Sequence, residues 1–141
     1  MNLAGQQKAD NNSKIKIILA EDSPVTRMVE KRILESSGFD VDDASDGAEA
    51  YEKMLGNGSR YDIVITDVQM PNLDGLQLCE KIRANESLRH IPIIIVSSMG
   101  RSDEQQKGFD AGADAYIVKG EFSKAGVEEI IENLLNKNEQ N

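Results

Sequence analysis

The chain has 141 residues, of which 39% are hydrophobic and 29% charged, and its formal net charge is −9. This length and composition fit one globular domain with a sizeable apolar core and exclude an intrinsically disordered chain. The acidic balance, together with the lack of a basic stretch, argues against direct binding to nucleic acid.

Along the chain, predicted strands alternate with predicted helices. Residues 1–14 are polar and aperiodic and should form a flexible N-terminal tail, residues 15–137 the folded domain, and residues 138–141 a C-terminal tail. Short runs rich in Ile and Val predict strands at 16–20, 62–66, 92–96 and 115–118, with a weaker strand at 40–43. Helices are predicted at 24–37, 46–55, 75–84 and 102–111, and after residue 123.

Helix-capping residues stand where these helices should begin and end. Ser23, Asp46 and Ser123 precede helical patterns, and each side chain can accept a hydrogen bond from the first helical turn. Gly38 and Gly56 follow two of the patterns and can end those helices. The result is five strand–helix units. Continuous apolar strands indicate a parallel sheet covered on both faces, so we predict a doubly wound α/β fold with strand order 2-1-3-4-5.

Polar residues follow four of the predicted strands. Glu21 and Asp22 follow the first strand, Asp67 the third, Ser97 closes the fourth, and Lys119 follows the fifth. Ligands of an open parallel sheet bind outside the carboxyl ends of the strands, where the strand order reverses. Taken one by one, such residues are usually solvated or cap a helix, but their joint placement predicts a functional site.

Three neighbouring carboxylates repel one another, and a divalent cation relieves that repulsion. Mg²⁺ prefers oxygen ligands and keeps several waters, so a few carboxylates and one carbonyl suffice to bind it. Lys119 and the Ser97 hydroxyl can contact phosphoryl oxygens, which leaves Asp67 as the nucleophile that forms an acyl phosphate.

At these residues the sequence resembles the response-regulator receiver family of two-component and chemotaxis-type signalling. The matching segments are 17–22 (IILAED), 67–75 (DVQMPNLDG), 95–98 (IVSS) and 113–119 (ADAYIVK). The resemblance implies a flavodoxin-like receiver fold from about residue 14 to the end of the last helix.

The resemblance also implies roles for individual residues. Asp67 matches the phosphate acceptor, Lys119 the phosphate-binding lysine, and Glu21 and Asp22 the acidic pair, with Asp22 the more direct Mg²⁺ ligand. Asp67 itself and the backbone carbonyl of Gln69 complete the implied metal site.

Two further residues match the family's switch positions, namely Ser97, the switch hydroxyl, and Tyr116, the switch aromatic. Phosphorylation is expected to shift the surface formed by the 102–111 helix, the 115–118 strand and the last helix, which would bind a downstream protein target. The phosphoryl donor would be a histidine on a partner histidine kinase or phosphotransfer domain. The chain would therefore be a signalling switch that catalyses only its own phosphorylation and dephosphorylation.

The sequence departs from the family pattern at two places. Gly120 stands where the family usually has a proline, often in a cis peptide bond, and a non-proline cis bond is costly, so a trans bond is expected here. Ser97 stands where threonine is common; it keeps the hydroxyl and lacks the methyl group that would restrict its rotamers.

Two other classes of function compete with this interpretation. A receiver-like module that works without phosphorylation should have lost the aspartate, the acidic pair or the lysine, and none is lost. A Mg²⁺-dependent phosphohydrolase with an aspartyl nucleophile would need a second acid two residues after Asp67, where this chain has Gln69.

Location and chain organisation are predicted from simpler features. No apolar run is long enough for a transmembrane helix, and the N-terminus lacks the apolar segment of a signal peptide. The single Cys79 cannot form an internal disulfide and has the helical spacing of a core thiol. We therefore expect a soluble cytoplasmic protein without membrane insertion, and the polar tails favour a single-domain regulator over an excised receiver.

Overall fold

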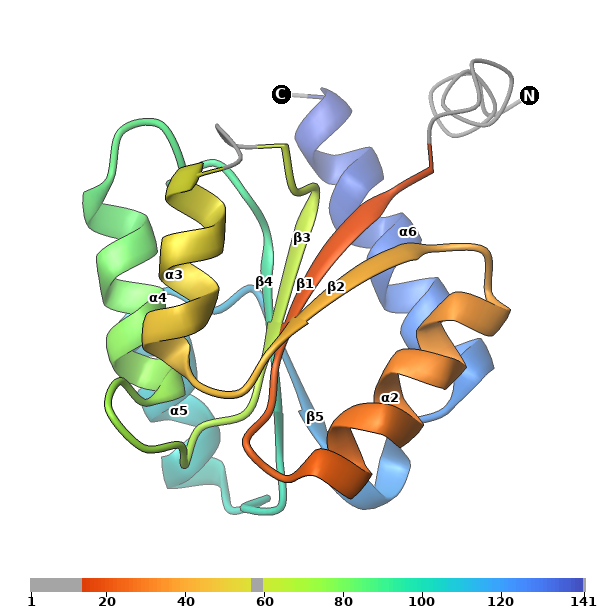
Figure 1. Cartoon of the computed structure of the whole chain (residues 1–141), viewed down its shortest axis with the longest axis horizontal. Coiled ribbons are helices and arrows are strands. Elements are labelled where there is room, and N and C mark those ends of the chain that lie inside the picture. Colours follow the sequence, from red (N-terminus) through yellow and green to blue (C-terminus); the bar gives the residue numbers. More distant parts are fainter. Residues whose placement is uncertain (1–13, 57–59, 141) are drawn as a thin grey trace.

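The computed structural model describes residues 14–56 and 60–140, and the side chains of this part except those of 138–140 (Figure 1). The predicted N-terminal tail, apart from Lys14, lies outside the described residues. In chain order the elements are β1 (Lys16–Ala20), α2 (Pro24–Ser36), β2 (Asp40–Ala44), α3 (Gly47–Gly56), β3 (Ile63–Thr66), α4 (Gly75–Ala84), β4 (Ile93–Ser97), α5 (Ser102–Ala111), β5 (Ala115–Val118), the short 3₁₀ helix η1 (Lys119–Glu121) and α6 (Lys124–Gln140).

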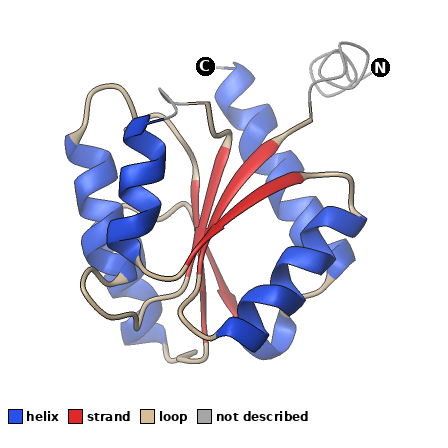
Figure 2. Ribbon diagram, viewed as in Figure 1, coloured by secondary structure: helices blue, strands red, loops and turns tan. Residues whose placement is uncertain are grey.

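The five strands form one parallel sheet in the order β2-β1-β3-β4-β5, which confirms the predicted topology. Helices α2 and α6 cover one face of the sheet, and α3, α4 and α5 cover the other (Figures 1 and 2). Successive residues of a strand point to opposite faces, so β1 contributes to both cores. Ile17 and Leu19 pack on the side of α2 and α6, whereas Ile18 and Ala20 pack on the side of the other three helices.

The observed ends of the elements differ from the predicted ones by a few residues. β2 extends to Ala44, β3 begins at Ile63, and β4 runs from Ile93 to Ser97. The largest difference lies at the C-terminus, where α6 continues to Gln140 through most of the expected tail 138–141. No glycine or proline interrupts this stretch, so the helix has no local reason to end earlier.

Side-chain caps begin the two helices that follow β1 and β3 at the carboxyl edge of the sheet. Ser23 accepts a hydrogen bond from the Thr26 amide (3.3 Å), with Pro24 in the first turn of α2, as predicted. Asp74 caps α4 by accepting from the Gln77 amide (2.8 Å), while the Gln77 side chain accepts from the Asp74 amide (3.0 Å). These caps give the loops after β1 and β3 defined ends.

Candidate functional site: an acidic cleft at the carboxyl edge of the sheet

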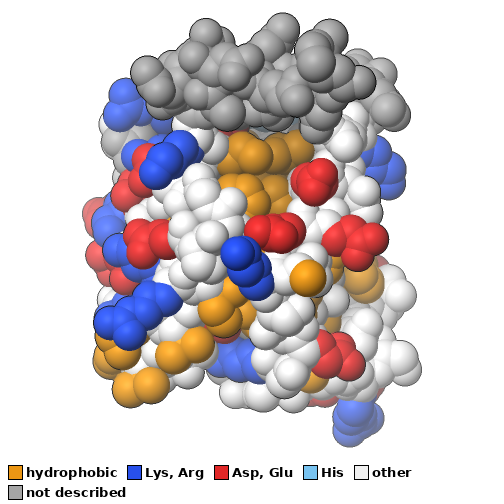
Figure 3. Space-filling view, turned by 90° about the vertical axis from the view of Figure 1, so that its right-hand side faces the viewer, with side chains coloured by type: hydrophobic (Ala, Val, Ile, Leu, Met, Phe, Trp, Pro, Cys, Tyr) orange, Lys and Arg blue, Asp and Glu red, His pale blue; other side chains and the backbone are white. Residues whose placement is uncertain are grey.

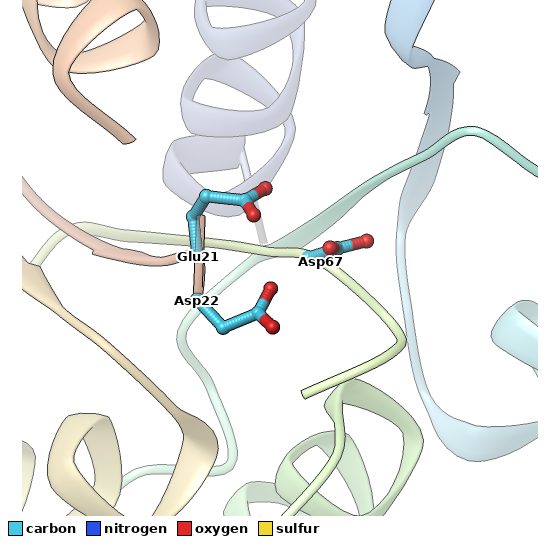
Figure 4. Close-up of side chains that lie close together, drawn as sticks. All are labelled: Glu21, Asp22 and Asp67. Carbon is cyan, nitrogen blue, oxygen red and sulfur yellow. The ribbon is translucent and has the colours of Figure 1, made fainter. Parts of the chain in front are cut away.

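Three acidic side chains meet where the central strands end (Figure 4). Glu21 and Asp22 follow β1 and Asp67 follows β3, and one carboxylate oxygen from each lies within 4.8 Å of the others. The two strands are hydrogen-bonded neighbours, and the Asp67 amide donates to the Ala20 carbonyl (3.0 Å). The structure therefore brings together residues that are more than 40 positions apart in the sequence, as the predicted strand order requires.

Lys119 supplies the positive charge of this cluster. Its ammonium nitrogen lies 3.0 Å from Glu21 Oε1 and 3.2 Å from Asp67 Oδ2. Burial alone would lower the pKa of Lys119, but its close contact with the Glu21 carboxylate and the negative charge of Asp67 outweigh burial and raise that pKa. The Lys119–Gly120 peptide is trans, as expected from the sequence, and Lys119 nevertheless reaches the cluster.

The three carboxylates differ in their exposure to water. Glu21 is 1% and Asp67 8% exposed, whereas Asp22 lies on the surface. Burial raises the pKa of Glu21, and the hydrogen bond that Glu21 Oε2 accepts from the Ser23 amide (3.0 Å) counteracts this effect. Asp67 Oδ1 accepts a hydrogen bond from the Val68 amide (2.7 Å), so Oδ2 is the oxygen that faces Lys119.

The donor set fits a hard divalent cation. It consists of oxygens alone, which Mg²⁺ prefers, and three carboxylates oppose a single ammonium group. Glu21 Oε1 is buried, and no donor among the described residues is directed at it with good hydrogen-bond geometry, although Lys119 lies nearby. A cleft of about 490 Å³ adjoins the cluster and leaves room for waters and a phosphoryl group; it is lined by Asp22, Val68, Gln69, Met70, Pro71 and Asp74.

Ser97 and Tyr116, the two predicted switch residues, are joined through one residue of the loop after β4. Ser97 is 1% exposed, and its Oγ accepts a hydrogen bond from the Met99 amide (3.1 Å). The Tyr116 hydroxyl donates to the carbonyl of the same Met99 (2.5 Å). The sequence interpretation predicted both residues but not this connection, because hydrogen bonds to backbone atoms leave no pattern in the sequence.

Sequence reasoning assigned no individual role to two residues that the structure singles out. Gly75, the first residue of α4, lies against the backbone of Asp67, so that an added Cβ would be 1.9 Å from the Asp67 carbonyl oxygen. Glu30 is a charged residue of α2 that is only 5% exposed. Its spacing of four from Leu34, the other buried residue of α2, was the signal available in the sequence. Cys79, in contrast, is the predicted core thiol, since it is buried and burial raises its pKa to about 12.

Comparisons with known proteins agree with this fold and site. Residues 17–132 match the family model of the response regulator receiver domain. The chain is 32% identical over 127 residues to chemotaxis protein CheY-3 of Vibrio cholerae, covering 89% of this chain and 95% of that protein. It is 40% identical over 121 residues to the gliding motility regulatory protein of Myxococcus xanthus; the match covers 86% of this chain but only 15% of that protein.

A solved structure extends the comparison to the metal. The receiver domain of a sensor histidine kinase from Pseudomonas aeruginosa superposes with a TM-score of 0.76 at 28% identity, covering 88% of this chain and 99% of that one. That structure is described as having a magnesium ion coordinated in its active site cleft.

The parallel sheet and the acidic cleft at its carboxyl edge define a receiver-type α/β protein. The chain belongs to the response regulator receiver domain family, whose members act in two-component phosphorelay signalling. Within the described part of the chain, no helix is both long enough and apolar enough to cross a membrane.

Proposed function

We propose that the chain is a Mg²⁺-dependent signalling switch whose phosphate acceptor is Asp67. The observation that carries the proposal is the placement of Asp67, a nearly buried carboxylate held by the Val68 amide and by Lys119 beside two further acids. An oxygen of Asp67 would form a bond to phosphorus as the bond to the donor nitrogen breaks, giving an acyl phosphate. Phosphate incorporation from acetyl phosphate with Mg²⁺, and not without it, tests the proposal.

The residues of the cleft divide the tasks of this reaction. Asp22, Asp67 and the Gln69 carbonyl are the proposed direct metal ligands, and Glu21 is proposed to complete the site through a water. Bound Mg²⁺ would neutralise charge on the phosphoryl group. Lys119, already paired with Asp67, would contact a second phosphoryl oxygen. The donor would be a histidine of a partner kinase or phosphotransfer domain, in keeping with the receiver domain of a histidine kinase found among the similar structures.

The metal site can be tested through its two neighbouring acids. Asp22→Asn should lower the Mg²⁺ affinity by roughly tenfold or more, since losing even an outer residue of a metal site often costs that much. Glu21→Gln should cost less, because Glu21 is already paired with Lys119 and is proposed to contact the ion through water. Titration with Mg²⁺ followed by NMR or fluorescence measures both. Equal and negligible losses in the two variants would contradict the proposed ligands.

The switch is proposed to run from Ser97 through Met99 to Tyr116. A phosphoryl oxygen would attract the Ser97 hydroxyl. Ser97 Oγ accepts a hydrogen bond from the Met99 amide, and the Met99 carbonyl accepts one from the Tyr116 hydroxyl, so a movement of Ser97 would reach Tyr116. Gly108 of α5 allows Tyr116 to lie close, because an added Cβ would come within 3.1 Å of the Tyr116 ring and 2.9 Å of Ile95. Phosphorylation would therefore shift the surface of α5, β5 and α6, where a downstream target is proposed to bind.

Ser97→Ala should uncouple phosphorylation from that surface while Asp67 still accepts phosphate. Adding beryllofluoride and Mg²⁺ to the wild type should change NMR shifts at Tyr116 and along α5, and these changes should be reduced severalfold in the variant. Ser98→Ala, at the exposed neighbouring position, is the matched control and should behave as the wild type. Shift changes confined to the cleft in the wild type would rule out this route.

A cytoplasmic location is likewise proposed and rests on the composition and on the single unpaired Cys79.

A further inference from the structure

Glu30 is a buried charged residue that the proposed chemistry leaves without a role. The buried polar side chains of the described residues are Glu21, Glu30, Thr66, Asp67 and Ser97. All of these except Glu30 lie at the carboxyl ends of the strands, in or directly beside the cleft. Glu30 instead lies on α2. Helices α2 and α6 form the right-hand side of Figure 1, which Figure 3 turns toward the viewer.

Glu30 and Lys119 both line a cavity of about 270 Å³ beside α2. The residues that line it are Val25, Thr26, Val29, Glu30, Ile33, Lys119 and Phe122. Lys119 thus borders both this cavity and the acidic cluster. Val25 and Val29 are 68% and 47% exposed, so the cavity opens to solvent and protons can reach it from water.

The lining of the cavity is mostly apolar, and this determines the chemistry of the carboxyl group. No hydrogen bond or ion pair to the Glu30 carboxyl is found among the described residues. Burial, and less strongly the negative charges of Glu21 and Asp67, raise the pKa of Glu30 to about 7, and the positive charge of Lys119 opposes this shift. No charged group of α6, which also packs on α2, acts on it appreciably.

We propose that Glu30 is a proton-binding residue of the phosphotransfer site, which takes up a proton from water when Asp67 becomes phosphorylated. The inference rests on the proposed function, since it requires the phosphoryl group to be added at Asp67. Glu30 makes no contact with the phosphoryl group and acts only through the electrostatic field that it shares with Lys119, Glu21 and Asp67.

The sign of the effect follows from the charges. With Mg²⁺ bound before and after the reaction, phosphorylation still adds negative charge to the cluster of Glu21, Asp22, Asp67 and Lys119, because a phosphoryl group carries more negative charge than the free Asp67 carboxylate. Well below its pKa, Glu30 is protonated before and after the reaction and imposes no cost. Above that pKa, an ionised Glu30 repels the added charge, or a proton must be taken up to remove the repulsion. The phosphorylated state is therefore favoured as the pH falls through the pKa of Glu30.

The effect can be measured with beryllofluoride as the phosphoryl mimic, at Mg²⁺ concentrations that saturate the protein at every pH. Relative to Glu30→Gln, the wild type should bind beryllofluoride equally well at a pH well below the pKa of Glu30, as measured by carboxyl-carbon NMR in the same Mg²⁺ buffer. At pH 8.5 it should bind roughly threefold to tenfold more weakly, because a nearby like charge costs about that much at an intermediate dielectric. Comparing the two proteins cancels the pH dependence of beryllofluoride itself, and Lys119 remains charged in both.

Glu35→Gln removes an exposed acid from the same helix and should keep the wild-type pH dependence. A direct measurement on the wild type, which does not depend on the folding of a variant, is the pKa of Glu30 from the NMR shift of its labelled carboxyl carbon. This pKa should rise when beryllofluoride binds. The same pKa with and without beryllofluoride, or the same pH dependence in Glu30→Gln and wild type, would overturn the inference and leave the proposed function intact. No beryllofluoride binding at any pH would overturn both.

Discussion

Asp67→Asn is expected to reduce phosphate incorporation from acetyl phosphate to background. Asp67 is the buried carboxylate that both Lys119 and the acidic pair approach, and an amide in its place is a poor nucleophile. The measurement is incorporation of radioactive phosphate in the presence of Mg²⁺, with acid and base treatment to identify an acyl phosphate. The substitution keeps the size and shape of the side chain, so the fold should survive.

Asp103→Asn is a suitable control for this experiment. Asp103 lies exposed in the first turn of α5 and does not line the cleft, and its replacement should leave labelling at the wild-type level. An acid-resistant, base-labile label that persists on Asp67→Asn would place the acceptor at another carboxylate and contradict the proposed function.

Among the substitutions proposed, Gly75→Ala is expected to lower the free energy of unfolding the most. Its Cβ would lie 1.9 Å from the Asp67 carbonyl oxygen and 3.0 Å from the Val68 Cα, and backbone atoms cannot rotate away as a side chain can. The Gly75 amide also donates to the Val68 carbonyl (2.8 Å), so the start of α4 cannot move without losing this hydrogen bond. Forced overpacking of this kind typically costs about 1–3 kcal/mol, and we expect a loss of about 3 kcal/mol in the free energy of unfolding. Urea denaturation measures it.

The same substitution should also weaken phosphorylation, because the clash falls on the acceptor residue itself. Gly56→Ala provides the control: Gly56 ends α3, no atom lies within 4 Å of an added Cβ, and its φ is not positive. Alanine there should be neutral or stabilise by up to about 1 kcal/mol. If both variants unfold at the same urea concentration as the wild type, close packing at Gly75 is not what the site depends on.

The sequence predicted most of the fold because its signals are local. Runs of Ile and Val and the caps at Ser23 and Asp46 define strands and helix starts within a few residues, so order, type and sheet topology followed. Boundaries were less accurate where local preferences compete. β2, with three aspartates in five residues, gave a weak signal, yet its chain is held in the sheet by pairing with β1.

The candidate site could be placed for a related reason. Parallel strands end at one edge of the sheet, so residues that directly follow strands must meet there, and Glu21, Asp22, Asp67 and Lys119 do. Their distances required the structure, as did the connection of Ser97 to Tyr116 through Met99.

What the sequence by itself determined is therefore the order of elements and the identity of the residues at the carboxyl edge of the sheet, because both depend on neighbours along the chain. Only the tertiary structure placed Glu30 in a cavity with Lys119 and showed that a side chain at Gly75 would clash with Asp67. Both facts depend on atoms brought close by packing between distant segments, and the free energy of a buried charge or a steric clash is set by those surroundings and not by the residue type.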